Sequence, residues 1–327
     1  MKLRSLFLAP NHRLAGAPAA AGVDRLRYVP SAGPEAGLWW GELLGDQRPV
    51  DAFSLTYDSA PLEAPLAMLG RAHVRLNATV DAALANWFVR IEDVAADGEV
   101  TAITGGGLSG AQRRSLEHPE PLMPGKEYAL ELDLHLGSWV WMPGHRIRVA
   151  VSNALWPMLW PTPYPMTTAL RLGGAGASAI TLPVVPGKHP SAPQLSPPEP
   201  AEAPPGITAP GGGYAWPGSS RLERDEVRGE STMTWRGTTA MDFPWGSFAH
   251  SEQLSYHVAD ARPEGASVEG EAESTEKLAG QVLTYRGHLR ISGDAATLHY
   301  SYTRELLRDG ALVRTRSWHE DIARDLQ

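Results

Sequence analysis

Alternating apolar and polar side chains predict short β-strands through the first 185 residues. Residues 74–80 alternate throughout, residues 88–94 alternate in part, and leucine stands at every even position from 130 to 136. Successive side chains of a strand point to opposite faces, so a period of two indicates strands with one buried face. Further strands are predicted at residues 5–8, 146–151, 167–172 and 180–185.

Turns that contain glycine or proline are predicted between these strands. Asp97-Gly98 and Pro143-Gly144 are turn pairs placed directly after or before predicted strands. No stretch of adequate length carries an apolar stripe with the 3.6-residue period of a helix. Short strands with such turns are typical of a β-sandwich, and the fold class predicted here is all-β, a jelly-roll sandwich.

The last 109 residues are also predicted to be β. The pair Asp309-Gly310 joins the final two strands as a hairpin, because both residue types accept the backbone conformation of a two-residue turn. An antiparallel meander is the simplest arrangement. Its strands are predicted at residues 232–236, 252–259, 267–274, 282–292, 297–307 and 312–319.

A proline-rich segment separates the two β regions. Ten prolines lie between Pro186 and Pro217, mixed with Gly, Ala, Ser and Glu. Proline lacks a backbone donor and stiffens the chain, so this segment cannot join the interior of a sheet. The expected organisation is therefore a jelly roll at 1–185, a linker at 186–218 and an antiparallel β domain at 219–327.

Charge and composition narrow the classes of function. The net charge of −8 argues against a nucleic-acid partner, since phosphate binding needs clustered positive charge. Without cysteine the chain has no disulfide, no thiolate metal site and no cysteine nucleophile. No apolar run approaches a membrane span, and the apolar stretch before Pro10 is too short for a secretory signal. A soluble, cytoplasmic protein is expected.

No arrangement for catalysis or for metal or cofactor binding emerges from the residues. No serine has glycine at both the −2 and +2 positions; the nearest, at Ser109, has its second glycine one place early. Glu131, Asp133 and His135 share a strand face, but their spacing of about 6.7 Å per step is too wide for one ion. A glycine-rich connection and a solvated face are the expected roles.

A proline-interrupted loop carries two tryptophans and a tyrosine. The segment reads ALWPMLWPTPYPM over residues 154–166, and its four prolines exclude a regular strand or helix. Such a loop either fills one end of the sandwich or presents an apolar wall to a partner. Trp156, Trp160 and Tyr164 are the candidate residues for contact with a partner or cleft, and both alternatives stay open from the residues alone.

Several motifs together resemble a known family. In chain order they are GDQRPVDAFSLTYDSAPL (45–62), WFVRIEDV (87–94) followed by Asp97-Gly98, PGHRIRV (143–149) and VSNALWP (151–157). Over residues 3–186 the chain resembles the C-terminal domain of the X-Pro dipeptidyl-peptidase and cocaine-esterase type (CocE/NonD) hydrolases. The β-rich tail is similar to an extension found in some of these proteins.

The resemblance implies a galactose-binding-like jelly roll that packs on an α/β-hydrolase domain and helps to wall its cleft. In the family the hydrolase domain carries the Ser-Asp-His triad and the activity, dipeptidyl-peptidase or esterase. That domain has no counterpart in this sequence, so no catalytic residue is carried over and the chain alone is expected to be inactive.

Three hypotheses follow from this comparison. The favoured one is the non-catalytic half of a split hydrolase, docking to a separately encoded α/β-hydrolase chain. The second is a free-standing jelly-roll module for a carbohydrate or small ligand. The third is a fragment whose catalytic part lies upstream. A neighbouring hydrolase gene with a Gly-x-Ser-x-x-Gly motif would favour the first or third hypothesis.

Overall fold

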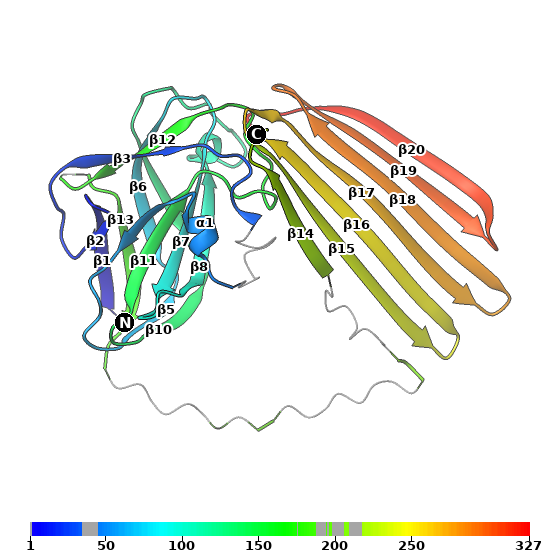
Figure 1. Ribbon diagram of the computed structural model, residues 1–327, viewed down its shortest axis with the longest axis horizontal. Coiled ribbons are helices and arrows are strands. Elements are labelled where there is room, and N and C mark those ends of the chain that lie inside the picture. Colours follow the sequence, from blue (N-terminus) through cyan, green and yellow to red (C-terminus); the bar gives the residue numbers. More distant parts are fainter. Residues whose placement is uncertain are drawn as a thin grey trace. The chain divides into compact units, whose positions relative to one another are not determined.

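Antiparallel β-sheet dominates the computed structural model, which describes residues 2–34, 45–174, 176–187, 194, 196–197, 206–208 and 218–327 (Figure 1). The strands fall into one sheet of thirteen and one of seven, with no strand shared between the two. Two compact units result, the first mainly residues 1–188 and the second mainly 189–325. The all-β prediction is confirmed.

The first unit is a β-sandwich whose strands hydrogen-bond in the order β3-β12-β6-β13-β1-β2-β4-β11-β7-β8, with β9 on β6 and β5 between β10 and β13. Its elements are β1 (Lys2–Ala9), β2 (Arg13–Ala15), β3 (Gly22–Arg27), α1 (Arg48–Asp51), β4 (Leu55–Asp58), β5 (Leu66–Gly70), β6 (His73–Val80), β7 (Asn86–Val94), β8 (Val100–Ser109), β9 (Tyr128–Asp133), β10 (Gly137–Trp141), β11 (Arg146–Ser152), β12 (Thr167–Leu172) and β13 (Ala179–Val185). Only a short parallel pairing, Arg13 with Asp58, links β2 to β4.

The predicted alternation builds the core of this sandwich. Leu76 on β6 and Leu130 on β9 are buried, as are Val89 on β7 and Val149 on β11, and all four belong to one apolar cluster. Leu136 departs from the pattern, being 70% exposed, because β9 ends at Asp133 and the chain turns before β10. The leucine repeat continues beyond the strand that it was expected to define.

The predicted turns place glycine where the backbone requires it. Gly98 and Gly144 have φ angles of +90° and +86°, and they close the β7–β8 and β10–β11 connections. Residues with a Cβ rarely adopt these angles, whereas glycine does so without steric cost. Both turn predictions are confirmed.

The second unit is an antiparallel meander, each strand pairing with the next along the chain. At the last hairpin Asp309 and Gly310 both have positive φ (+52° and +80°), as the predicted two-residue turn requires. Its strands are β14 (Gly218–Asp225), β15 (Glu230–Phe243), β16 (Gly246–Ala259), β17 (Arg262–Leu278), β18 (Gln281–Gly293), β19 (Thr297–Arg308) and β20 (Ala311–Ala323).

Sequence reasoning missed β14 and shortened most of the other strands in this unit. The strands span up to 17 residues, and parts of them carry polar or small side chains on both faces, as in Gly237–Ala240 of β15, beyond the predicted strand at 232–236. Such stretches lack the contrast between apolar and polar positions on which the prediction relied. Most of the predicted linker, 186–218, lies outside the described residues.

We expect limited proteolysis within residues 191–209 to release two β units that fold independently. Proline-dense backbone makes few ladder hydrogen bonds and is accessible to proteases, and each sheet closes its pairing within its own unit. Mass spectrometry of the fragments, followed by thermal unfolding of each, measures this. Cleavage inside either sheet with 191–209 intact would show that the proposed division at 186–218 is wrong.

Candidate functional site

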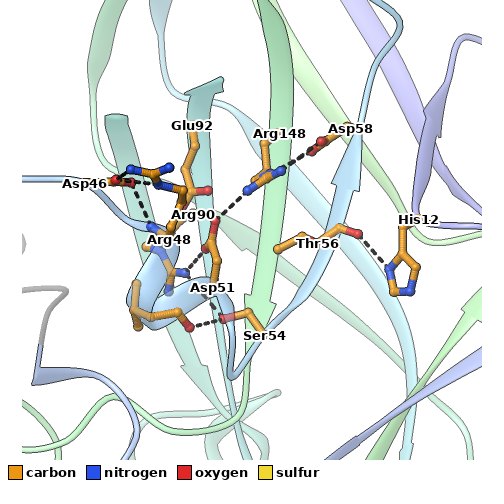
Figure 2. A network of polar contacts seen from close by, with 11 residues as sticks. His12, Asp46, Arg48, Asp51, Ser54, Thr56, Asp58, Arg90, Glu92 and Arg148 are labelled. Atoms are coloured by element: carbon orange, nitrogen blue, oxygen red, sulfur yellow. Dashed lines mark hydrogen bonds and ion pairs between the residues drawn. The ribbon is translucent and has the colours of Figure 1, made fainter. Parts of the chain in front are cut away.

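Three of the sequence motifs meet in a buried network of charged side chains on the outer face of β4, β11 and β7 (Figure 2). Asp51, at the end of α1, accepts hydrogen bonds from two arginines. Its Oδ1 lies 2.7 Å from Nη2 of Arg90 on β7, and its Oδ2 lies 2.9 Å from Nη1 of Arg148 on β11. One carboxylate therefore joins the short helix to both strands.

Each arginine has a second carboxylate. Arg148 makes a two-point contact with Asp58 on β4, at 2.7 and 2.8 Å. Arg90 donates from Nε to Oε1 of Glu92, two residues along the same strand, at 2.8 Å. The Arg90 and Glu92 side chains are essentially inaccessible to solvent. Charge-assisted contacts of this kind are strong and directional, and they fix the relative positions of the elements that carry them.

The network contains two arginines and three carboxylates, so one negative charge is in excess if all are ionised. Burial raises the pKa of Glu92 to about 8, against the opposing effect of Arg90. With Glu92 protonated, two positive and two negative charges balance. Arg90 Nη1 and Glu92 Oε2 are buried without a hydrogen-bond partner among the described residues. Arg90 and Glu92 are too deeply buried to contact a substrate, and the contacts of the network hold the helix and the three strands together.

A second polar junction ties the β10–β11 turn to β7. Asp93 is buried, and its Oδ2 accepts a hydrogen bond from Trp139 Nε1 at 3.0 Å. Its Oδ1 lies 2.9 Å from His145 Nδ1, in the Pro-Gly-His turn. The histidine of this motif thus positions a turn, because its ring is held by a carboxylate that also anchors β10.

The proline-interrupted loop at 154–166 is divided between core and surface. Trp156 is only 3% exposed, and its backbone N–H donates to Ala32 O at 2.9 Å. Gly33 lets the loop approach: its φ is +126°, and a Cβ there would lie 2.8 Å from Leu155 Cα. Trp156 is therefore a buried side chain of the first unit.

The rest of the loop offers apolar surface. Leu159 and Tyr164 are 42% and 39% exposed, and Trp160 is partly buried with its indole Nε1 unpartnered among the described residues. The role of Trp156, Trp160 and Tyr164 in contacting a partner stays a prediction. The exposed fractions assign the larger share of such a contact to Trp160 and Tyr164.

Other candidate residues occupy ordinary structural positions. Ser109 ends β8 and is followed by a single 3₁₀ turn, Gly110–Gln112, in place of the helix that a nucleophile elbow needs. Glu131, Asp133 and His135 are exposed, and Asp133 Oδ1 lies 2.9 Å from His73 Nδ1. No set of metal-ligating side chains gathers in the described residues, nor does any helix there have the length and apolar character of a membrane span.

Sequence reasoning did not single out Asp51, Arg90 or Arg148. The signal was present, since Arg90 and Glu92 stand among apolar residues in the motif at 87–94 and Asp51 stands in the motif at 45–62. Charged residues inside an apolar strand need a partner when they are buried. Which partner, however, depends on the pairing of β7 with β11, which the sequence alone does not give.

We expect Asp51→Ala to destabilise the first unit by about 3–5 kcal/mol, because it leaves the buried Arg90 and the partly buried Arg148 without their shared carboxylate. Urea unfolding followed by circular dichroism measures the change. Asp46→Asn is the matched control, since Asp46 pairs with the exposed Arg48 near the same helix and exposed pairs contribute little. Equal, small effects of both substitutions would contradict the structural role of Asp51.

Glu92 should make stability depend on pH. Its pKa rises from 4.5 to about 8 on folding, so the folded chain holds this proton more tightly than the unfolded chain between those values. The stability contributed by the protonated group is full below pH 4.5 and is lost as pH rises toward 8. Glu92→Gln, which cannot ionise, should gain stability relative to the parent over that range in urea titrations. A pH-independent difference would contradict the assignment.

Comparisons with known proteins agree with these motifs. A protein from Mycobacterium bovis with the provisional name serine esterase is 36% identical over 126 residues, covering 33% of this chain and 20% of that protein. The cocaine esterase of a Rhodococcus species is 31% identical over 114 residues, covering 34% and 20%. The chain thus spans about a fifth of the length of these curated relatives.

A solved structure shares the fold. The crystal structure of an aminopeptidase from a marine sediment Thaumarchaeota archaeon superposes with a TM-score of 0.51 at 23% identity, over 57% of this chain and 37% of that one. The sequence model of the family described as X-Pro dipeptidyl-peptidase C-terminal non-catalytic domain matches residues 7–191 of this chain. This match spans more than half of the sequence and confirms the resemblance seen in the motifs: the chain belongs to the X-Pro dipeptidyl-peptidase C-terminal non-catalytic domain family.

Proposed function

We propose that the first unit is the non-catalytic part of a CocE-type serine hydrolase and packs against a separately encoded α/β-hydrolase chain, whose substrate cleft it helps to wall. Membership of a non-catalytic domain family is the observation that carries this proposal. The relatives named as esterases are about five times longer than the stretch they share with this chain. The esterase or dipeptidyl-peptidase chemistry would reside in the partner.

The loop at 154–166 supports a contact surface on this unit. Its exposed side chains Leu159 and Tyr164, with the partly buried Trp160, are of the apolar and aromatic kinds that concentrate at the centre of protein interfaces. The loop is also held in place, because Trp156 is packed in the core and hydrogen-bonded to Ala32. A surface fixed in this way loses little conformational entropy on docking.

The role of such a surface would be to shape the partner's substrate cleft and to exclude water from it. A wall of apolar side chains excludes water from the site, and electrostatic interactions with the reacting groups are stronger without water. The chain's own residues supply no proton transfer in this scheme. The nucleophile, its base and the oxyanion donors would all lie on the partner.

The test is co-expression with the α/β-hydrolase encoded beside this chain, identified by a Gly-x-Ser-x-x-Gly motif. A fluorophosphonate probe should label a serine of the hydrolase and none of this chain. Tyr164→Ala and Trp160→Ala should each weaken the complex at least about tenfold in titration calorimetry. Tyr164→Ala, whose side chain is the more exposed, should leave the melting temperature nearly unchanged.

Two controls separate docking from folding. Leu3→Ala removes an exposed apolar side chain outside the loop and should leave the affinity unchanged. Trp156→Ala should cost about 3–5 kcal/mol of stability, as for other buried tryptophans. Absence of a neighbouring hydrolase, labelling of a serine in this chain, or full affinity in the Tyr164 and Trp160 variants would each contradict the proposal.

A further inference from the structure

Arginine and aromatic side chains gather around a hollow on one face of the second unit. The hollow has a volume of about 300 Å³ and lies over β18, β19 and the edge strand β20. It is separate from the sandwich, and nothing in the proposed function uses it. Its lining residues are Tyr285, Arg304, Leu306, Arg314, Arg316 and Trp318.

The strand register brings two of these arginines directly opposite each other. Arg304 on β19 pairs with Arg316 on β20, and Arg314 pairs with Leu306 one step along the same face. Directly opposed side chains on neighbouring strands have Cβ atoms about 5 Å apart, and like charges in that position destabilise a sheet. In the described part of the chain, none of the three arginines forms an ion pair.

The other face of the same strands is arranged differently. There Arg286 lies 2.8 Å from Glu273, and Arg290 lies 3.4 Å from Glu269, each pair joining β18 to β17. Acidic residues therefore oppose arginines on that face, while the hollow has none in its lining. The hollow therefore carries a local excess of positive charge in a chain with a net charge of −8.

Aromatic rings hold two of the arginines in place. The Arg304 guanidinium carbon lies 5.3 Å from the centre of the Tyr285 ring, and that of Arg316 lies 4.6 Å from the Trp318 ring. Trp318 in turn stacks on Tyr302 at 5.5 Å. A guanidinium held over a ring keeps its edge N–H groups available for an oxygen acceptor.

Protection of an exposed edge is the simpler explanation for charge on β20. Charged side chains on an edge strand oppose pairing with another chain. That role requires charge alone. It does not require a like-charged pair across two strands, stacked on rings and beside the apolar Leu306, so the hollow needs a further explanation.

We propose that the hollow binds a small organic anion, in which a carboxylate or phosphate is joined to an aryl or similar flat apolar group. The arginines would hold the anion through paired N–H contacts, and Trp318, Tyr285 and Leu306 would contact the apolar part. A volume of about 300 Å³ is at the small end of the range for ligand sites. The bound anion would also relieve the repulsion between Arg304 and Arg316.

Calorimetric titration of the full chain with phenyl phosphate and benzoate tests this, with inorganic phosphate and acetate as matched probes lacking the ring. Phenyl phosphate should bind with a Kd of about 1 mM or below, and each aryl anion should bind at least about tenfold more tightly than its partner without the ring. Arg316→Gln should weaken binding at least about tenfold, and Trp318→Ala should remove the preference for the aryl probes.

The melting temperature separates a binding role of Arg316 from a structural one. Because Arg316→Gln removes a like-charge contact, our proposal expects it to raise the melting temperature of the unliganded chain while it weakens binding. If Arg316 had only a structural role, the substitution would not weaken binding. Arg290→Ala, on the opposite face of the same sheet, should leave phenyl phosphate binding unchanged. If Trp318→Ala does not fold, Arg314→Ala serves as a second test of the anion contact, since Arg314 is exposed, and the comparison of aryl with ring-free probes on the parent chain still tests the apolar contact. Equal binding of phosphate and phenyl phosphate, no binding at about 10 mM, or equal loss in Arg290→Ala would overturn the proposal.

Discussion

The contact of Asp51 with both Arg90 and Arg148 is the constraint on which the first unit depends. A buried arginine is tolerable only beside a carboxylate, and here one carboxylate serves two arginines from neighbouring strands. The short helix α1 therefore has to sit on β7 and β11, with β4 held by Asp58 at the far side. This explains why three distant motifs reappear together: they are the separated parts of one network.

The ionisable groups of this network hold elements of the unit together. Asp51, Arg90 and Glu92 are buried, while Arg148, Asp58 and, at the second junction, His145 keep part of their side chains accessible to solvent. Exposed apolar side chains of this unit include Leu159 and Tyr164 in the loop at 154–166. The family to which the chain belongs is that of a non-catalytic domain.

In the second unit, charged side chains are paired across the surface of the sheet. Its strands form a single seven-stranded sheet. Opposite charges that lie at its surface are paired across strands, as in Arg286 with Glu273. The hollow over β18–β20 breaks this rule by opposing Arg304 to Arg316. An unpaired charge costs little at a surface compared with the interior, and such a site can persist without a ligand.

The fold class, about half of the strands of the first unit, all strands of the second unit except β14, and the turns at Gly98, Gly144 and Asp309-Gly310 could be predicted from the sequence. These features depend on local rules: alternation of side chains, and glycine or aspartate at positive φ. The sequence also located the motifs of the family. Other features could be seen only in the tertiary structure. The shared carboxylate of Asp51, the burial of Trp156 and the pairing of Arg304 with Arg316 each depend on strand register and on contacts between residues far apart in the chain. No local pattern encodes these contacts, because which strands become neighbours is settled only when the core packs.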